Sequence, residues 1–101
     1  ESEISVSMLF EGSPLQRPRR AGLARNAALA LGAIPDHQAD RELFRALAFD
    51  DDASVRDAAA WSLARTRGAE PLVRSALEAA HARETDAAAR EQMRLNLEGA
   101  P

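Results

Sequence analysis

The residues whose type and spacing most clearly suggest a chemistry are four arginines near the start of the chain, and that chemistry is phosphate binding. The four are Arg17, Arg19, Arg20 and Arg25. No acidic residue lies between Gly12 and Pro35, so this segment carries +4, while nine arginines against sixteen acids leave −7 on the rest. Such a cluster can attract phosphate even on an acidic protein. All thirteen basic residues are arginine, which suits bidentate contact with phosphate or carboxylate.

The elements around this cluster would place it at the start of a helix. Pro18 disfavours helix in the residue before it, so residues 14–20 are expected to form a connector that carries the first three arginines. A helix over 21–34 follows, and its free N–H groups and dipole favour an anion, which Arg25 and Asn26 would help to bind. The alternative is local: Arg25 caps or pairs with a neighbouring acid, Asn26 bonds to the connector backbone, and the other arginines are solvated.

Three copies of one helical pattern, 32 and then 34 residues apart, fill most of the chain. The copies are Leu23, Ala27 and Leu31; Val55, Ala59 and Leu63; and Ala89, Met93 and Leu97. A period in this range indicates two helices per repeat, and such units bury their apolar faces against neighbouring units. The sequence therefore predicts an all-α fold, a short α-solenoid of about six helices.

The expected organisation is a single domain over residues 1–101. It divides into an N-terminal helix and basic connector (1–20), a first unit (21–49), a second unit (53–83) and a terminal helix (86–99). The helices are expected over 2–11, 21–34, 40–49 with Asp40 as its cap, 54–68, from Pro71 onward, and 86–97.

The repeat type follows from two acid and arginine pairs. Asp50 precedes Arg56 by six residues, and Glu84 precedes Arg90 by six. This spacing resembles the ladder of HEAT repeats, in which an acid of one repeat and the Arg of the next form a hydrogen-bonded row. The first copy has Arg19 where the acid is expected, so Arg25 is left to face another group or an acid of the second unit.

The N-terminal third also resembles the C-terminal HEAT-like domain of the epoxyqueuosine reductases. The stretches that carry this resemblance are 11–15 (EGSPL), 25–32 (RNAALALG) and 60–63 (AWSL). The chain departs from the family at Ala33, where Asn is common, and in the added charge of Arg19 and Arg20.

The resemblance implies a part in tRNA modification. That family reduces the epoxide of epoxyqueuosine in tRNA with cobalamin and two iron–sulfur clusters, which are held by cysteines ahead of the HEAT-like part. This chain has no cysteine, so we expect no cofactor, no metal and no catalysis by the chain alone. The resemblance implies instead an accessory domain that binds the tRNA anticodon stem-loop through Arg17, Arg19, Arg20, Arg25 and Asn26.

Two alternatives stay open. One is a HEAT-repeat scaffold that binds a protein partner and has no RNA role. The other is a structural domain that closes one end of a larger enzyme through an apolar face near Ile4, Met8 and Phe10. The chain begins with Glu1 rather than Met, which favours a piece of a longer protein.

The remaining residues with chemical potential have structural interpretations. Trp61 is expected to cover the seam between units. His37 and His81 lack metal-ligand spacing, so they are expected to be solvated residues of a loop or a helix end. Residues 50–52 (DDD) lack the alternation of a calcium loop, so capping and the ladder explain them better. No apolar run is long enough to span a membrane and no segment resembles a signal peptide, so we expect a soluble, cytoplasmic protein.

Overall fold

The computed structural model describes residues 17–99, with side chains from Arg19 onward, and these residues form five helices. They are α1 (Arg17–Leu31), α2 (His37–Phe49), α3 (Ala53–Arg67), α4 (Pro71–Arg83) and α5 (Ala87–Gly99). No strand occurs within this range, so the predicted all-α fold is confirmed. The helix expected over residues 2–11 lies outside the described part of the chain.

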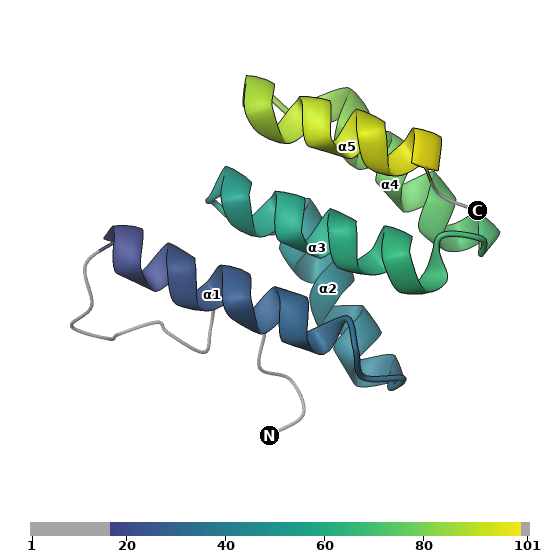
Figure 1. Ribbon diagram of the computed structural model, residues 1–101, viewed down its shortest axis with the longest axis horizontal. Helices are drawn as coiled ribbons and strands as arrows, with labels where there is room; N and C mark the ends of the chain where they lie inside the picture. The colour runs from purple at the N-terminus through teal and green to yellow at the C-terminus, as the bar shows by residue number, and fades with distance from the viewer. Residues whose placement is uncertain (1–16, 100–101) are drawn as a thin grey trace.

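The helices form two layers. A front layer holds α1, α3 and α5 side by side, and a back layer holds α2 and α4 (Figure 1). The central helix, α3, packs against each of the other four. This arrangement of alternating helices in two layers agrees with a short repeat-like domain in which each front helix is stacked on the next.

Local signals define most of the helix starts. Asp52 caps α3, since its Oδ1 accepts the backbone N–H of Ser54 at 2.9 Å. Pro71 begins α4 as predicted, because a proline in the first turn needs no hydrogen-bond donor. Two starts differ from prediction, and both move toward the N-terminus.

The first difference concerns residues 17–20. The sequence predicted them as part of a connector over 14–20, and that prediction is wrong. These residues form the first turn of α1, and Pro18 fits there because the first turn leaves its N–H groups without helical partners in any case. The second difference is the cap of α2. Asp36, not Asp40, is the N-cap, and its Oδ1 accepts the Gln38 N–H at 2.7 Å.

Asp40 instead joins α2 to α3. Its Oδ1 lies 2.6 Å from Nε of Arg67, which also donates from Nη2 to the carbonyl oxygen of Ile34 at 2.8 Å. One guanidinium therefore holds the end of α3 against both the α1–α2 turn and the first turn of α2.

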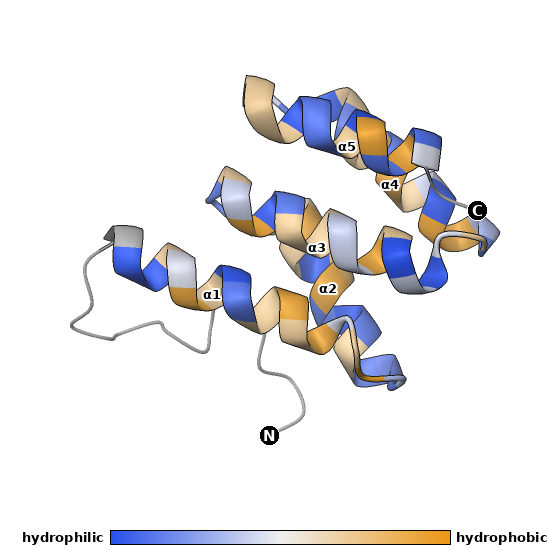
Figure 2. Ribbon diagram, viewed as in Figure 1, coloured by the Kyte–Doolittle hydropathy of each residue, from blue (hydrophilic) through white to orange (hydrophobic). Residues whose placement is uncertain are grey.

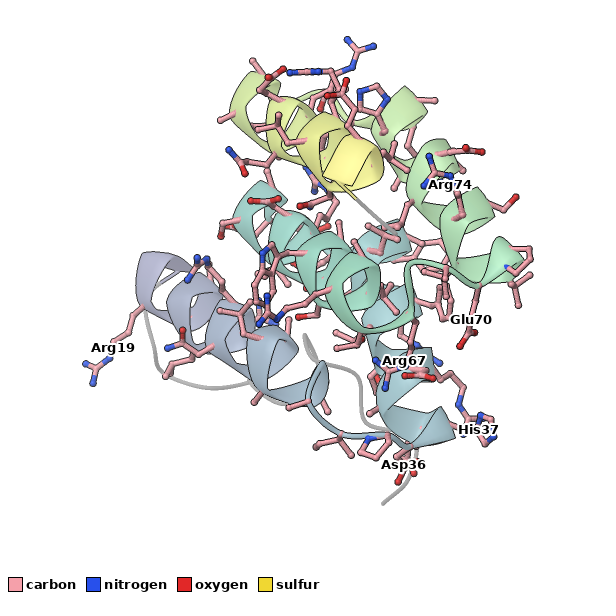
Figure 3. The ribbon with its side chains drawn as sticks, turned by 45° about the vertical axis from the view of Figure 1, so that its right-hand side comes forward. Arg19, Asp36, His37, Arg67, Glu70 and Arg74 are labelled. Carbon is pink, nitrogen blue, oxygen red and sulfur yellow. The ribbon has the colours of Figure 1, made fainter. Side chains whose placement is uncertain are left out.

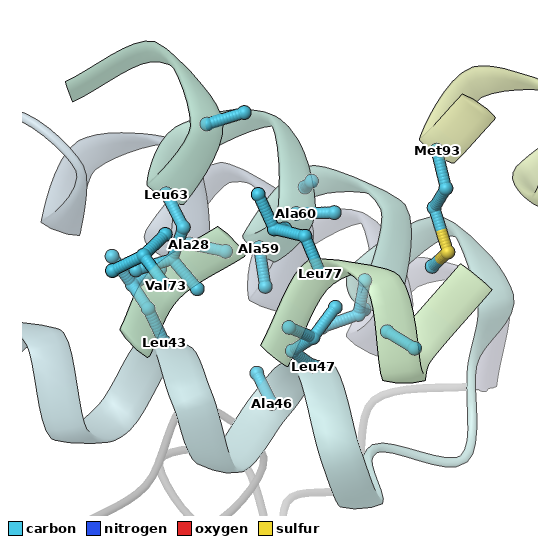
Figure 4. Close-up of a cluster of buried hydrophobic side chains, with 14 of the residues drawn as sticks. Ala28, Leu43, Ala46, Leu47, Ala59, Ala60, Leu63, Val73, Leu77 and Met93 are labelled. Carbon is cyan, nitrogen blue, oxygen red and sulfur yellow. The ribbon is translucent and has the colours of Figure 1, made fainter. Parts of the chain in front are cut away.

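The core consists mainly of alanines among a few larger residues, so the helices approach closely (Figure 4). The contact between α1 and α3 is the tightest example. A Cβ on Gly32 would lie 2.7 Å from Cβ of Ser62, and the Ser62 hydroxyl donates to the Ala28 carbonyl at 3.1 Å. Glycine is therefore required at this crossing, and α1 is fixed on α3.

Hydrophilic residues occur on every described helix, and none is hydrophobic along its whole length (Figure 2). Among these helices, none has the length and apolar character needed to cross a membrane.

Candidate binding surface on the front layer

The arginines predicted to bind RNA are spread around α1. A helix turns about 100° per residue, so Arg19, Arg20 and Arg25 point in three directions. Arg19 is exposed and extends away from the body (Figure 3), and it makes no hydrogen bond or ion pair with the described residues. The side chain of Arg17 lies outside the described part. Asn26 is exposed on the same side of α1 as Arg19.

The other two arginines lie near acids of the second unit. Arg20 lines a cavity of about 300 Å³ together with the three aspartates of residues 50–52. Arg25 is exposed and acts on Asp57 of α3, where burial raises the pKa of the carboxyl and the arginine charge opposes that rise. The predicted cluster is therefore not gathered on one surface, and an acid of the second unit does reach Arg25. The role of these residues in RNA binding stays a prediction.

The ladder is formed around Arg56. Its Nε and Nη2 donate to Oε1 and Oε2 of Glu84 at 2.8 and 2.7 Å, and its Nη1 donates to the Asp50 carbonyl oxygen at 2.8 Å. These hydrogen bonds hold the pKa of the Glu84 carboxyl below its usual value, against the effect of burial. The pair joins the second unit to the α4–α5 turn, with the Glu84 side chain 2% exposed.

Arg90 takes no part in this ladder. Glu84 faces α3, where Arg56 donates to both of its oxygens, and the exposed side chain of Arg90 makes no hydrogen bond or ion pair among the residues described. The sequence spacing of six residues thus indicated the right residue types. The partner of Glu84, however, is Arg56, which lies 28 positions before it.

A row of apolar residues crosses the front layer, and the sequence analysis did not identify it. Leu29, Trp61 and Leu95 each follow the middle residue of one sequence copy by two positions and lie on α1, α3 and α5. Leu29 is half-buried, whereas Trp61 and Leu95 are 42% and 44% exposed. We call these three residues the apolar row. The repeat register could have revealed it, had the outward positions been aligned as well as the inward ones.

The row contains a shallow cavity where α1 meets α3. A volume of about 180 Å³ is lined by Leu29 and Trp61 together with Gly32, Ala33, Ser62, Arg65 and Thr66. The guanidinium carbon of Arg65 lies 5.1 Å from the centre of the Trp61 ring, within cation–π range. Trp61 therefore lies at the seam between units, as predicted, and also presents part of its ring to solvent.

Charged residues flank the row at one helical turn on either side. Arg25, Asp57 and Glu91 precede it on α1, α3 and α5, and Arg65 follows it on α3. Two arginines and two carboxylates therefore flank the row, and these four charges sum to zero.

The outer edge of α5 differs from the matching edge of α3. Ala60 and Ala64 of α3 are buried, and 34 residues later α5 carries Arg94 and Glu98. Arg94 forms ion pairs with Glu98 and with Glu91. This edge of α5 is therefore polar, whereas the matching edge of α3 is buried and apolar.

Comparison of the chain with protein-family models, curated proteins and solved structures finds no match. The resemblance to HEAT repeats and to the epoxyqueuosine reductases therefore stays a prediction. Among the described residues, no three histidine or carboxylate side chains are grouped so that they could hold a metal ion.

Proposed function

We propose that this chain is a non-catalytic helical-repeat module that binds a protein partner across its front layer. The observation that carries the proposal is the apolar row, in which Trp61 of α3 and Leu95 of α5 are exposed and Leu29 of α1 is half-buried beside Trp61. Burial of exposed apolar surface drives protein association, and tryptophan and arginine are the residues most enriched at the energetic centres of interfaces. Trp61 and Arg65 lie at the middle of this row.

The charge pattern favours a protein partner over RNA. A nucleic acid needs phosphate-binding cations on one surface, and here the arginines of α1 point in three directions, with Arg20 beside the three aspartates of residues 50–52. Asp57, in the middle of the front layer, would repel a phosphate backbone. Recognition of the tRNA anticodon stem-loop and a cytoplasmic location stay predictions from the sequence.

Photocrosslinking in cells tests the proposal. A benzophenone amino acid would replace Trp61 in one variant and Leu72 in another, because Leu72 is an equally apolar position, 76% exposed, at the start of α4 in the back layer. We expect discrete protein adducts from position 61 and none of comparable strength from position 72. Equal adducts from both positions, or an adduct at position 61 that ribonuclease removes, would refute the proposal.

A further inference from the structure

We propose that residues 2–11 pack as a helix on the outer face of α1, which we define as Leu23, Ala27 and Ala30. These three residues are spaced four and three positions apart, so they lie on one side of the helix. At about 100° per residue they stand about 100–160° around the helix axis from Ala28, whose carbonyl oxygen bonds to α3. Three observations support this occupant: the exposure of the outer face, the length of chain that leads to it, and the charges beside it.

The outer face is exposed, whereas the other two copies of the repeated pattern are buried. Leu23 opens the first copy and is 38% exposed, but Val55 and Ala89, which open the second and third, are 0% and 4% exposed. Each of those helices packs against the helix that precedes it in the sequence, α3 against α2 and α5 against α4. Among the described residues no helix precedes α1, which forms one edge of the front layer (Figure 1). By the same order, the cover of α1 is the segment directly before it.

Residues 2–11 have the composition and length of such a cover. Their apolar side chains are Ile4, Val6, Met8, Leu9 and Phe10. A helix of ten residues is about 15 Å long and fits beside the fifteen residues of α1. Residues 12–16 can span about 17 Å when extended, and Leu23 lies only about 9 Å along the axis from Arg17. The link is therefore long enough for the segment to fold back and short enough to keep it beside α1.

The charges beside the outer face also select this segment. Residues 1–11 contain three glutamates and no arginine, so their side chains carry −3. Arg19 is exposed one turn before Leu23 and makes no hydrogen bond or ion pair with the described residues. A glutamate of the segment would form a charge-assisted pair with it.

A second copy stacked end to end is a poorer occupant. The free edge of α5 carries Arg94, which pairs with Glu91 and Glu98. Packing this edge on the outer face of α1 would bury three charged side chains against apolar ones, which is unfavourable. The apolar side chains of residues 2–11 thus have a target within the chain itself and need no larger enzyme to cover them.

Reaction of a single introduced thiol tests whether the outer face is covered. The protein has no cysteine, so Leu23→Cys and Leu72→Cys each place one thiol on the complete chain. The described residues leave Leu23 38% and Leu72 76% exposed, a difference of about twofold. We expect the thiol at position 23 to react with an aromatic disulfide reagent at least about tenfold more slowly than the thiol at position 72.

Variants of the segment supply the matched control. I4E/M8E in the Leu23→Cys protein replaces two apolar side chains one turn apart and should bring the rate at position 23 to within about twofold of that at position 72. S2E/S5E adds the same charge at two serines of the same segment and should leave the slow rate unchanged. None of these four positions lies in α1 to α5, and circular dichroism would establish that both variants are folded.

Rates at positions 23 and 72 within about twofold of each other would overturn the inference. So would an equal effect of S2E/S5E, or slow reaction that persists in I4E/M8E. Slow reaction that appears only at high protein concentration would also overturn it, because the cover would then be a second copy.

Amide hydrogen exchange gives a second measurement that involves no substitution at position 23. In the otherwise unchanged chain, residues 2–11 should exchange at least about tenfold more slowly than the same residues in I4E/M8E. Equal exchange in the two proteins would refute the packed helix.

Discussion

The ion pair between Arg56 and Glu84 predicts a large loss of stability when Arg56 is replaced by alanine. The Glu84 side chain is 2% exposed and the Arg56 side chain 20%, and two hydrogen bonds join them at 2.7 and 2.8 Å. Removal of one partner from a buried pair costs about 3–5 kcal/mol, because the other charge stays buried without compensation.

For Arg56→Ala the expected loss in the free energy of unfolding lies somewhat below that range. Arg56 is partly in contact with water, and Oε2 of Glu84 also accepts the Asp86 N–H at 3.1 Å, a hydrogen bond that does not involve the replaced side chain. The variant also loses the hydrogen bond from Arg56 to the Asp50 carbonyl. We therefore expect Arg56→Ala to lower the free energy of unfolding by about 2–3 kcal/mol.

Urea unfolding measures this loss, followed both by circular dichroism at the helix band and by Trp61 fluorescence. The midpoint should shift with little change in the slope, since the folded state remains equally compact. Arg94→Ala is the control, because Arg94 also contacts two glutamates but on the exposed edge of α5, and its loss should be much smaller. A loss below about 1 kcal/mol for Arg56→Ala would refute the argument that this pair holds the units together.

Three further predictions concern the rest of the framework. Gly32→Ala should destabilise the protein by about 1–3 kcal/mol in the same assay, because the added Cβ would overlap Ser62; an unchanged midpoint would show that the α1–α3 crossing can widen. Asp52→Ala should cost about 1 kcal/mol, since the cap of α3 loses the hydrogen bonds from the backbone N–H and the hydroxyl of Ser54; no loss would mean that water replaces the cap. The pKa of Glu84 is lower in the folded protein than its ordinary 4.5, so the ionised carboxylate stabilises the fold above that pH, and this stabilisation should be lost as the pH falls through the folded pKa. Glu84→Gln should therefore make the free energy of unfolding less sensitive to acid. An unaltered pH profile would contradict the role given to the Glu84 carboxylate.

The helices themselves were largely predictable from the sequence, because the signals that define them are local. Asp52 and Pro71 act on the backbone within a few residues of themselves, and the repeat of inward-facing residues identifies the buried face of α3 and α5. On α1 the predicted face is wrong, because Leu23 is 38% exposed and the buried residues are Ala24 and Ala28. Where prediction failed, at residues 17–20 and at the cap of α2, two local signals competed. Pro18 could end a connector or open a helix, and both Asp36 and Asp40 are suitable caps.

The binding surface could not be predicted in the same way, because it depends on contacts between residues that lie far apart in the sequence. Six residues separate Glu84 from Arg90, yet Glu84 pairs with Arg56, because stacking of the units brings the α4–α5 turn against α3 and leaves Arg90 outside. In the same way, the arginines of α1 are neighbours along the chain but diverge around the helix axis.

The sequence by itself therefore determined that the chain is helical, where most helices begin, and which residues of α3 and α5 face inward, since each of these depends on interactions within one or two turns. Tertiary structure alone decided which acid meets which arginine and which outward residues line up across helices. Those outcomes depend on the angle and height at which α1, α3 and α5 pack, and small residues such as Gly32 and Ser62 set that packing by allowing close approach.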